Sequence, residues 1–293
     1  MSGNNFQGKQ NLAGALFLVP AAALLLIFIG YPVLMAFFRS LTKFDMLTPG
    51  QWVGLNNYLS ILTSPDFLNS LAVTSKFVLG SGIPILLLSL GLAVVLNKTF
   101  KASQLFKLII FAPVVLSEAV TAIVWKILLH PYGAMNQYLI DLNIIDSYVK
   151  WLNDPKYALA GIILFIIWKE TGYFMVIFLT GLQNIPGIFH EAAAIDGASE
   201  RQIFFRITLP LLKPTILFAG VIMLINLLNT FTPFYVMTKG GPVNSTEVLS
   251  LLIYDTGFDF MLMGKASAMS VVMLLIVAVL SIILFRVGRS YQP

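Results

Sequence analysis

Long runs of apolar residues, separated by shorter polar segments, set the pattern of this 293-residue chain. Six of the runs reach the length of about 20 residues that an α-helix needs to cross the hydrocarbon core of a bilayer. We therefore predict an all-α transmembrane fold with six membrane-spanning helices. The predicted spans are residues 12–38, 73–96, 108–129, 158–182, 211–236 and 266–285.

The connections between the spans are too short to hold a second soluble domain. We predict one six-helix transmembrane domain over residues 12–285, preceded by a short segment, 1–11, and followed by a tail, 286–293. The composition agrees, because charged residues make up only 11% of the chain and the mean hydropathy is +0.88. About a quarter of the residues of a soluble domain are charged.

The same composition excludes several kinds of site. The chain contains no cysteine, which excludes disulfides and thiolate metal sites. His130 and His190 stand alone, without the spacing of metal ligands, so we expect no metal site. No nucleophile–base arrangement stands out either, so we expect no catalytic residues and no enzyme activity. Nothing in the sequence indicates a nucleic-acid partner.

The distribution of lysine and arginine predicts the orientation. One set of polar segments carries eight of these residues and three acids, whereas the longer set on the other side carries six and eight acids. Lysine and arginine are enriched in cytoplasmic loops. We therefore place the first set in the cytoplasm. It includes both termini and the segment 183–210.

The polar segment 184–210, between the fourth and fifth predicted spans, contains signals for a helical hairpin. Ile188, Ala192 and Ile195 fall at i, i+4 and i+7, which places them on one face of a short helix. Gly197 follows and suits the left-handed conformation that often ends a helix.

A second helix is predicted directly after this turn. Ser199 and Gln202 have the spacing of a capping box. The helix presents Ile203, Phe204 and Ile207 and is predicted to stop near Pro210.

Three stretches of this hairpin resemble the EAA motif of binding-protein-dependent ABC importer permeases. They are Glu191-Ala192-Ala193, Asp196-Gly197-Ala198 and Ile207-Thr208-Leu209-Pro210. The resemblance implies a type I ABC importer permease fold, in which the hairpin is the coupling helix that docks into a groove on an ATPase subunit. The alternative is an amphipathic hairpin that only joins two spans.

The resemblance also implies roles for single residues. Glu191 would be the charged contact, Ala192 and Ala193 would allow close approach, and Gly197 would make the turn. The other implied coupling residues are Asp196, Ile207, Leu209 and Pro210.

Further stretches resemble the carbohydrate branch of that family, as in permeases of the maltose and glycerol-phosphate type. They are Trp125, Gly133-Ala134-Met135-Asn136, Trp168, Gly181-Leu182-Gln183-Asn184-Ile185-Pro186 and Thr238-Lys239-Gly240-Gly241-Pro242. This resemblance implies a multi-pass protein of the bacterial cytoplasmic (inner) membrane, surrounded by lipid. Its implied partners are a homologous second permease, two ABC ATPase subunits and an extracytoplasmic sugar-binding protein.

The chain itself has no phosphate-binding loop. The nearest approach to Gly-x-x-x-x-Gly-Lys-Ser/Thr ends at Gly264-Lys265, where the spacing is wrong and Ala266 follows the lysine. We therefore expect no cofactor on this chain, with ATP and Mg²⁺ bound by the partner ATPase.

Three charged residues, Glu118, Lys169 and Glu170, lie within predicted spans. A charge at the bilayer centre costs about 2.5–3.5 kcal/mol on insertion scales, so each should face protein or water. In one interpretation Glu118 and Lys169 form a structural pair between helices. In the other, some of these groups line a translocation path.

The second interpretation predicts a path of hydrogen-bonding side chains with an aromatic platform, which a sugar needs. In the maltose-type family, the substrate pocket is built from the corresponding helices, although the residues at those positions differ here. The predicted path residues are Glu118, Thr121, Glu170, Tyr173, Asn226, Asn229 and Thr230. The sequence leaves the identity of the sugar or sugar phosphate open. A self-sufficient proton-coupled transporter, with Glu118 or Glu170 as the proton relay, is the alternative function.

Overall fold

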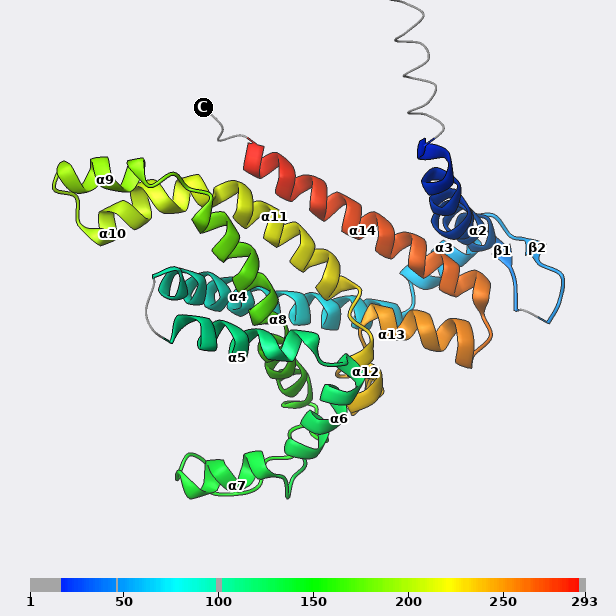
Figure 1. The fold of residues 1–293 in the computed structure, drawn as a ribbon. Coiled ribbons are helices and arrows are strands. Elements are labelled where there is room, and N and C mark those ends of the chain that lie inside the picture. Colours follow the sequence, from blue (N-terminus) through cyan, green and yellow to red (C-terminus); the bar gives the residue numbers. More distant parts are fainter. Residues whose placement is uncertain (1–16, 46, 99–101, 290–293) are drawn as a thin grey trace, which may run out of the picture. The chain divides into compact units, whose positions relative to one another are not determined.

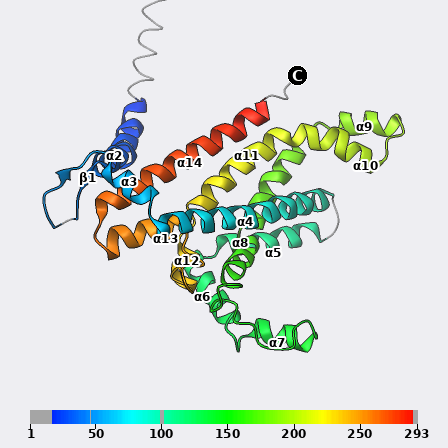
Figure 2. The ribbon, with the colours of Figure 1, turned by 180° about the vertical axis from the view of Figure 1, so that it is seen from behind.

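The computed structural model of the chain describes residues 17–45, 47–98 and 102–289. Helices make up nearly all of its regular structure (Figure 1 and Figure 2). The predicted segment 1–11, residues 12–16 of the first predicted span and residues 290–293 of the predicted tail lie outside the described residues.

Five described helices are long and apolar enough to cross a membrane. They are Phe17–Ser40, Pro65–Asn97, Ala158–Gln183, Glu200–Met237 and Met263–Arg286. A sixth span is present if Ser103–Val115 and Glu118–Leu128, which are bent by 99° to each other, count as one. The all-α transmembrane fold is confirmed, but the predicted span 108–129 is broken rather than continuous.

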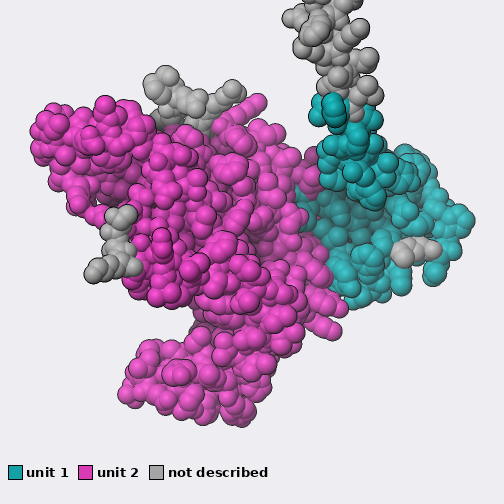
Figure 3. All heavy atoms as spheres, in the orientation of Figure 1, with its two compact units in different colours: residues 1–64, 253–273 teal, residues 65–252, 274–293 magenta. Residues whose placement is uncertain are grey.

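The chain divides into two compact units, which Figure 3 colours separately. The smaller unit contains residues 1–64 and 253–273, and the larger unit contains residues 65–252 and 274–293. One membrane domain can contain both units, so the single domain over 12–285 stays a prediction.

The smaller unit contains the described part of the first helix and a short β-ribbon. Its elements are η1 (Leu26–Gly30), α2 (Tyr31–Ser40), β1 (Thr42–Lys43), β2 (Gln51–Trp52), α3 (Asn56–Leu62), η3 (Asp255–Asp259) and the first part of α14 (Met263–Arg289). β1 and β2 pair in antiparallel fashion. Strands of two residues are too short to show an alternation of apolar and polar positions, so the sequence does not predict them.

Asn57 connects the elements of the smaller unit. Its side chain is buried, and Nδ2 donates hydrogen bonds to the carbonyl oxygens of Ser40 (2.8 Å) and Thr42 (2.9 Å). The backbone N–H of Gly264, at the start of α14, donates to the carbonyl oxygen of Phe44 at 3.0 Å. The loop after α2 is therefore held by α3 on one side and α14 on the other.

The larger unit contains most of the helices. They are α4 (Pro65–Asn97), α5 (Ser103–Val115), α6 (Glu118–Leu128), α7 (Ala134–Asp141), α8 (Ala158–Gln183), α9 (Ile188–Ile195), α10 (Glu200–Ile203), η2 (Phe204–Thr208), α11 (Leu209–Leu228), α12 (Thr232–Met237) and most of α13 (Leu249–Tyr254). The end of α14 belongs to it as well.

The central helix of the larger unit is α8, which packs against α4, α5 and α11. Its buried phenylalanines, Phe165, Phe174 and Phe178, belong to the main apolar core. In the same core the ring of Phe77 on α4 meets that of Phe234 on α12 edge to face, with centroids 4.8 Å apart. Packing of this kind holds helices together in lipid, where burial of apolar surface gives no net driving force.

A glycine permits the close approach of α5 to α8. A Cβ atom at Gly172 would overlap the carbonyl oxygen of Ile110 and touch the Cα of Phe111. Small residues at helix interfaces let backbones approach in this way. Any larger residue at Gly172 would push α5 away from α8.

Lys169 on α8 caps the carboxyl end of α5. Its side chain is only 5% exposed, and Nζ donates to the carbonyl oxygens of Pro113 (2.6 Å) and Leu116 (2.5 Å). The last carbonyl groups of a helix have no intrahelical partner, and unsatisfied backbone groups are costly within a bilayer. A cation also suits the negative end of the helix dipole. Lys169 thus stabilises the break between α5 and α6.

Asn136 organises the connection between α6 and α8. It is fully buried, and Nδ2 donates to the carbonyl oxygens of Pro131 (2.7 Å) and Val149 (2.8 Å). Its Oδ1 accepts from the indole N–H of Trp151 at 2.9 Å and from the backbone N–H of Val149 at 3.3 Å. A fully bonded buried amide fixes both ends of this loop against each other.

We expect Lys169→Met to destabilise the bend. Methionine fills a similar apolar volume but leaves the buried carbonyl oxygens of Pro113 and Leu116 without their donor. A hydrogen bond to a charged group contributes about 1.5–3 kcal/mol. The midpoint of thermal unfolding of the detergent-purified protein should therefore fall by roughly 5 °C.

Lys150→Met is the matched control, because Lys150 is exposed in the loop before α8. Its midpoint should stay within about 1 °C of the unaltered protein. If Lys169→Met unfolds at the same temperature as this control, the capping role is wrong.

Candidate functional site

The hairpin predicted at 184–210 is present, and a Schellman motif ends its first helix. The N–H of Ala198 bonds the carbonyl oxygen of Ala193 at 3.0 Å, and the N–H of Gly197 bonds that of Ala194 at 3.1 Å. Gly197 adopts φ +77°, which a residue with a side chain rarely does. The predicted turn at Gly197 is confirmed.

The capping box at the start of α10 is also confirmed. The backbone N–H of Ser199 donates to Oε1 of Gln202 at 2.8 Å, and the N–H of Gln202 donates to Oγ of Ser199 at 3.4 Å. In addition, Nε2 of His190 lies 3.0 Å from Oγ1 of Thr208, which joins α9 to η2. The two arms of the hairpin are therefore fixed to each other.

The sequence predicts that the second arm stops near Pro210, and this prediction is wrong. α10, η2 and α11 follow one another directly, and Pro210 lies in the first turn of α11. Because η2 runs directly into α11, Pro210 lies within a continuous helix, where its missing N–H removes one backbone hydrogen bond. The π-helical turn η2 precedes it, so the chain stays helical from the hairpin into the fifth span.

One face of α9 points away from the rest of the chain. Ile195 is 87% exposed and Ile188 68% exposed, and Ala192 is exposed beside them. Ala193, on the opposite face, is buried. Ile188, Ala192 and Ile195 form what we call the outer face of α9. Periodicity predicts that these residues share a face, but not that the face is uncovered.

The remaining predicted coupling residues lie around the turn and at the base of the hairpin. Glu191 is exposed on α9. Asp196, Gly197 and Ile207 border a surface hollow of about 280 Å³. Leu209 and Pro210 begin α11. At the start of α10, Glu200 pairs with Lys98 at 3.0 Å, but both side chains are largely exposed and such a pair contributes little.

The predicted path residues lie on α6, α8 and the end of α11. Glu118 and Thr121 are on α6, Glu170 and Tyr173 on α8, Asn226 on α11, and Asn229 and Thr230 in the break that follows it. The break at residues 229–231 interrupts the predicted span 211–236. The hydroxyl of Ser250 donates to the carbonyl oxygen of Thr230 at 2.6 Å and so stabilises this break.

The structure brings the three membrane charges together without a direct ion pair. Glu118, Lys169 and Glu170 interact electrostatically. However, the hydrogen bonds of Lys169 go to backbone carbonyl groups, and in the described chain its Nζ forms no salt bridge with Glu118. Glu118 and Lys169 thus interact without a direct ion pair among the described residues, and whether they are structural or line a path stays a prediction. Glu118 occupies the first turn of α6, where an acid suits the positive end of the helix dipole.

The hydroxyl and amide groups of the predicted path mostly bond within their own helix. Thr121 donates to the carbonyl oxygens of Ser117 and Glu118, each at 3.0 Å. Nδ2 of Asn229 donates to the carbonyl oxygen of Ile225 at 2.8 Å. The side-chain oxygens can still accept further hydrogen bonds.

Sequence reasoning missed two residues that join α6 to α12. Thr232, in the first turn of α12, lies next to Glu118. Nζ of Lys126 donates to the carbonyl oxygen of Val236 at 3.0 Å. A threonine near a break and a lysine near a helix end carry no spacing signal that would reveal these partners.

The residues of this chain from 57 to 293 match the family described as "Binding-protein-dependent transport system inner membrane component". The chain is 38% identical over 288 residues to the "Probable ABC transporter permease protein YesP" of Bacillus subtilis (strain 168), covering 97% of this chain and 92% of that protein. It is 38% identical over 295 residues to the "Lactose transport system permease protein LacF" of Rhizobium radiobacter, covering 99% and 98%.

The fold is also found in a solved structure. The chain matches one chain of a bacterial ABC transporter involved in the import of the acidic polysaccharide alginate, with a TM-score of 0.84, 23% identity and coverage of 97% of this chain and 98% of that one. This likeness concerns the fold alone. Both the sequence match and the helical architecture lead to one conclusion. The chain belongs to the family of binding-protein-dependent transport system inner membrane components.

Proposed function

We propose that this chain is the permease subunit of an ATP-binding-cassette importer for a sugar or sugar-like solute. A binding protein delivers the solute outside the cytoplasm, and separate ATPase subunits hydrolyse the ATP. The observation that carries the proposal is the outer face of α9. Two isoleucines and an alanine on a rigid, capped hairpin are left uncovered by the chain itself, as a docking helix requires.

The substrate class comes from the relatives. Three of them are named for the transport of lactose (LacF of Rhizobium radiobacter), sulfoquinovosyl glycerol (SmoG of Agrobacterium fabrum) and trehalose or maltose (MalF of Thermococcus litoralis). The chain is 34% identical to each of the last two over 96% of its length. All of these solutes carry sugar hydroxyls, which the acidic and amide side chains near the α6–α12 contact can bind.

The partners follow from the uncovered surfaces. From Phe17 to Arg39, no residue of the helix Phe17–Ser40 is buried within the described chain. A helix that is apolar all round and uncovered by its own chain faces lipid or another subunit. We propose that a homologous second permease covers part of this surface and that two ATPase subunits bind the coupling hairpins of the pair.

The proposed orientation places both termini and the hairpin in the cytoplasm, as the charge distribution favours. Closure of the two ATPase subunits then moves the hairpin. Because α10, η2 and α11 are continuous, this movement reaches the break at residues 229–231, next to Thr232 and Glu118. Glu118, Thr121, Glu170, Tyr173, Asn226, Asn229 and Thr230 are the proposed path residues.

A proton-coupled transporter is the second candidate function, because Glu118 and Glu170 lie close enough to interact within the larger unit. Such a transporter would need no ATPase and would leave the outer face of α9 unused. Reconstitution distinguishes the two. The importer takes up sugar only with ATP and the ATPase present, whereas the proton-coupled transporter responds to a pH gradient alone.

Ile195→Asp should abolish binding of the ATPase. The substitution places a carboxylate at the carboxyl end of the outer face of α9, where a docked partner would have to desolvate it. Since Ile195 is 87% exposed, the chain itself should fold and insert normally. Copurification with the ATPase should drop by about tenfold or more, which corresponds to about 1.4 kcal/mol or more.

Leu142→Asp is the matched control, because Leu142 is 67% exposed in the loop between α7 and α8. The control should copurify normally. Normal ATPase recovery with Ile195→Asp would show that this face does not dock the ATPase.

Glu170→Gln should raise the KM for sugar uptake while the rate of ATP hydrolysis without substrate stays the same. A hydrogen bond from a sugar hydroxyl to a carboxylate is stronger than one to an amide. The loss should be about tenfold in kcat/KM, measured with the reconstituted importer.

Thr180→Val on the same helix is the control, because the hydroxyl of Thr180 bonds only the carbonyl oxygen of Val176. Equal KM values for both variants would show that Glu170 does not bind the transported sugar.

A further inference from the structure

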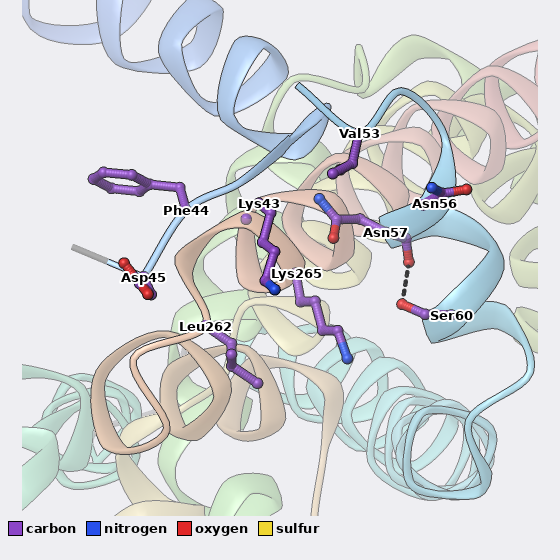
Figure 4. Close-up of a pocket in the computed structure, with 10 residues that line it drawn as sticks. Lys43, Phe44, Asp45, Val53, Asn56, Asn57, Ser60, Leu262 and Lys265 are labelled. Carbon is purple, nitrogen blue, oxygen red and sulfur yellow. Dashed lines mark hydrogen bonds between the residues drawn. The ribbon is translucent and has the colours of Figure 1, made fainter. Parts of the chain in front are cut away.

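A pocket of about 350 Å³ lies within the smaller unit, outside the hairpin and the path. Its walls come from the ribbon strand β1, the loop after it, α3 and the start of α14 (Figure 4). The lining residues are Lys43, Phe44, Asp45, Val53, Asn56, Asn57, Ser60, Leu262, Gly264 and Lys265. This volume falls in the range of about 300–1,000 Å³ that small-molecule sites occupy.

Two lysines give the pocket its chemistry. Lys43 and Lys265 line the same cavity, and their ammonium ends extend in the same direction in Figure 4. Among the described residues, neither ammonium group has a hydrogen bond or an ion pair with a protein group. Two ammonium groups that line one cavity repel each other, and an anion bound there would offset that repulsion.

A third cation stands next to the pocket. The guanidinium carbon of Arg39 lies 4.5 Å from the centroid of the ring of Phe44, one of the lining residues. The pocket also adjoins the amino end of α14, a helix of 27 residues whose dipole favours negative charge there.

The one acid of the lining, Asp45, is already engaged. Its Oδ1 accepts from the hydroxyl of Thr48 at 2.7 Å and from the backbone N–H groups of Thr48 (2.8 Å) and Leu47 (3.2 Å). The bond from the Thr48 hydroxyl is the main reason why the pKa of Asp45 lies below its ordinary value. With Asp45 ionised, the two lysines leave the lining with a net positive charge, and Oδ2 can accept from a hydroxyl group.

The position of the pocket along the chain corresponds to the edge of a membrane. Lys43 comes three residues after the end of α2, and Lys265 is the third residue of α14. Trp52, 64% exposed, lies near Phe38, with ring centroids 6.2 Å apart. Tryptophan is enriched at the membrane–water interface, at the level of the lipid headgroups.

We propose that this pocket binds the headgroup phosphate of an anionic phospholipid, with Lys43 and Lys265 as its ligands. Phe44, Val53 and Leu262 supply apolar walls for the glycerol backbone and the first carbons of the acyl chains. A free phosphate ion would use only the lysines and leave these walls in water. With the proposed orientation, the lipid belongs to the outer leaflet.

The test measures lipid retention. The full-length chain, copurified with its partner subunits in detergent, is incubated with mixed micelles of phosphatidylglycerol or of phosphatidylcholine, and retained lipid is counted by native mass spectrometry. The unaltered protein should retain phosphatidylglycerol several-fold better than phosphatidylcholine. The double variant Lys43→Gln/Lys265→Gln should lose this preference, by roughly tenfold or more, because each lysine contributes to anionic-lipid attraction.

Two further variants make the result specific. Lys43→Arg/Lys265→Arg keeps both charges and should keep the preference. Lys150→Gln/Lys156→Gln removes two cations that do not line the pocket and should also keep it. An equal preference in the unaltered protein and in Lys43→Gln/Lys265→Gln would overturn the proposal.

A final experiment, competition with inorganic phosphate, distinguishes a lipid site from a site for a free anion. Inorganic phosphate at millimolar concentration should neither displace phosphatidylglycerol from the unaltered protein nor raise its unfolding temperature. If inorganic phosphate does both, and neither effect occurs in Lys43→Gln/Lys265→Gln, the pocket is a free-anion site and the lipid assignment is wrong.

Discussion

The need to satisfy backbone polar groups inside a bilayer is the constraint on which the functional region depends. The chain leaves helical geometry at Leu116 and Ser117, which frees carbonyl groups at the end of α5. Lys169 satisfies them from the neighbouring helix α8. This bond makes possible the 99° bend that starts α6 at Glu118. Without it, the acidic groups and the α12 contact would not meet where they do.

The hairpin and the membrane core are joined by covalent continuity and by local bonds. The Schellman motif and the capping box fix the two arms, and the contact between His190 and Thr208 ties α9 to the base of the next helix. A rigid hairpin can present its outer face to a partner without ordering side chains and backbone at the moment of binding, which lowers the cost of association.

The sequence is informative about local features and poor at long-range partners. Apolar run length predicts most of the spans, and the spacing of Ser199 and Gln202 predicts the capping box. It does not predict the break after Val115, because an apolar run is the same whether the helix is straight or bent. It does not identify the partner of Lys169 either, since carbonyl acceptors are present at every residue. Periodicity on α9 likewise gives a face but not what covers it.

Because α10, η2 and α11 are continuous, the hairpin is joined to one long helix. From Glu200 to Leu228 the helical rise amounts to about 40 Å. A small rotation at the hairpin therefore becomes a larger displacement at the far end, in proportion to that length. Pro210 and Pro214 lack the N–H that would stiffen the first turns of α11. The helix therefore bends more easily near the hairpin than farther along. In the proposed mechanism, the rest of its length transmits a displacement of the hairpin to the break at residues 229–231, beside Thr232.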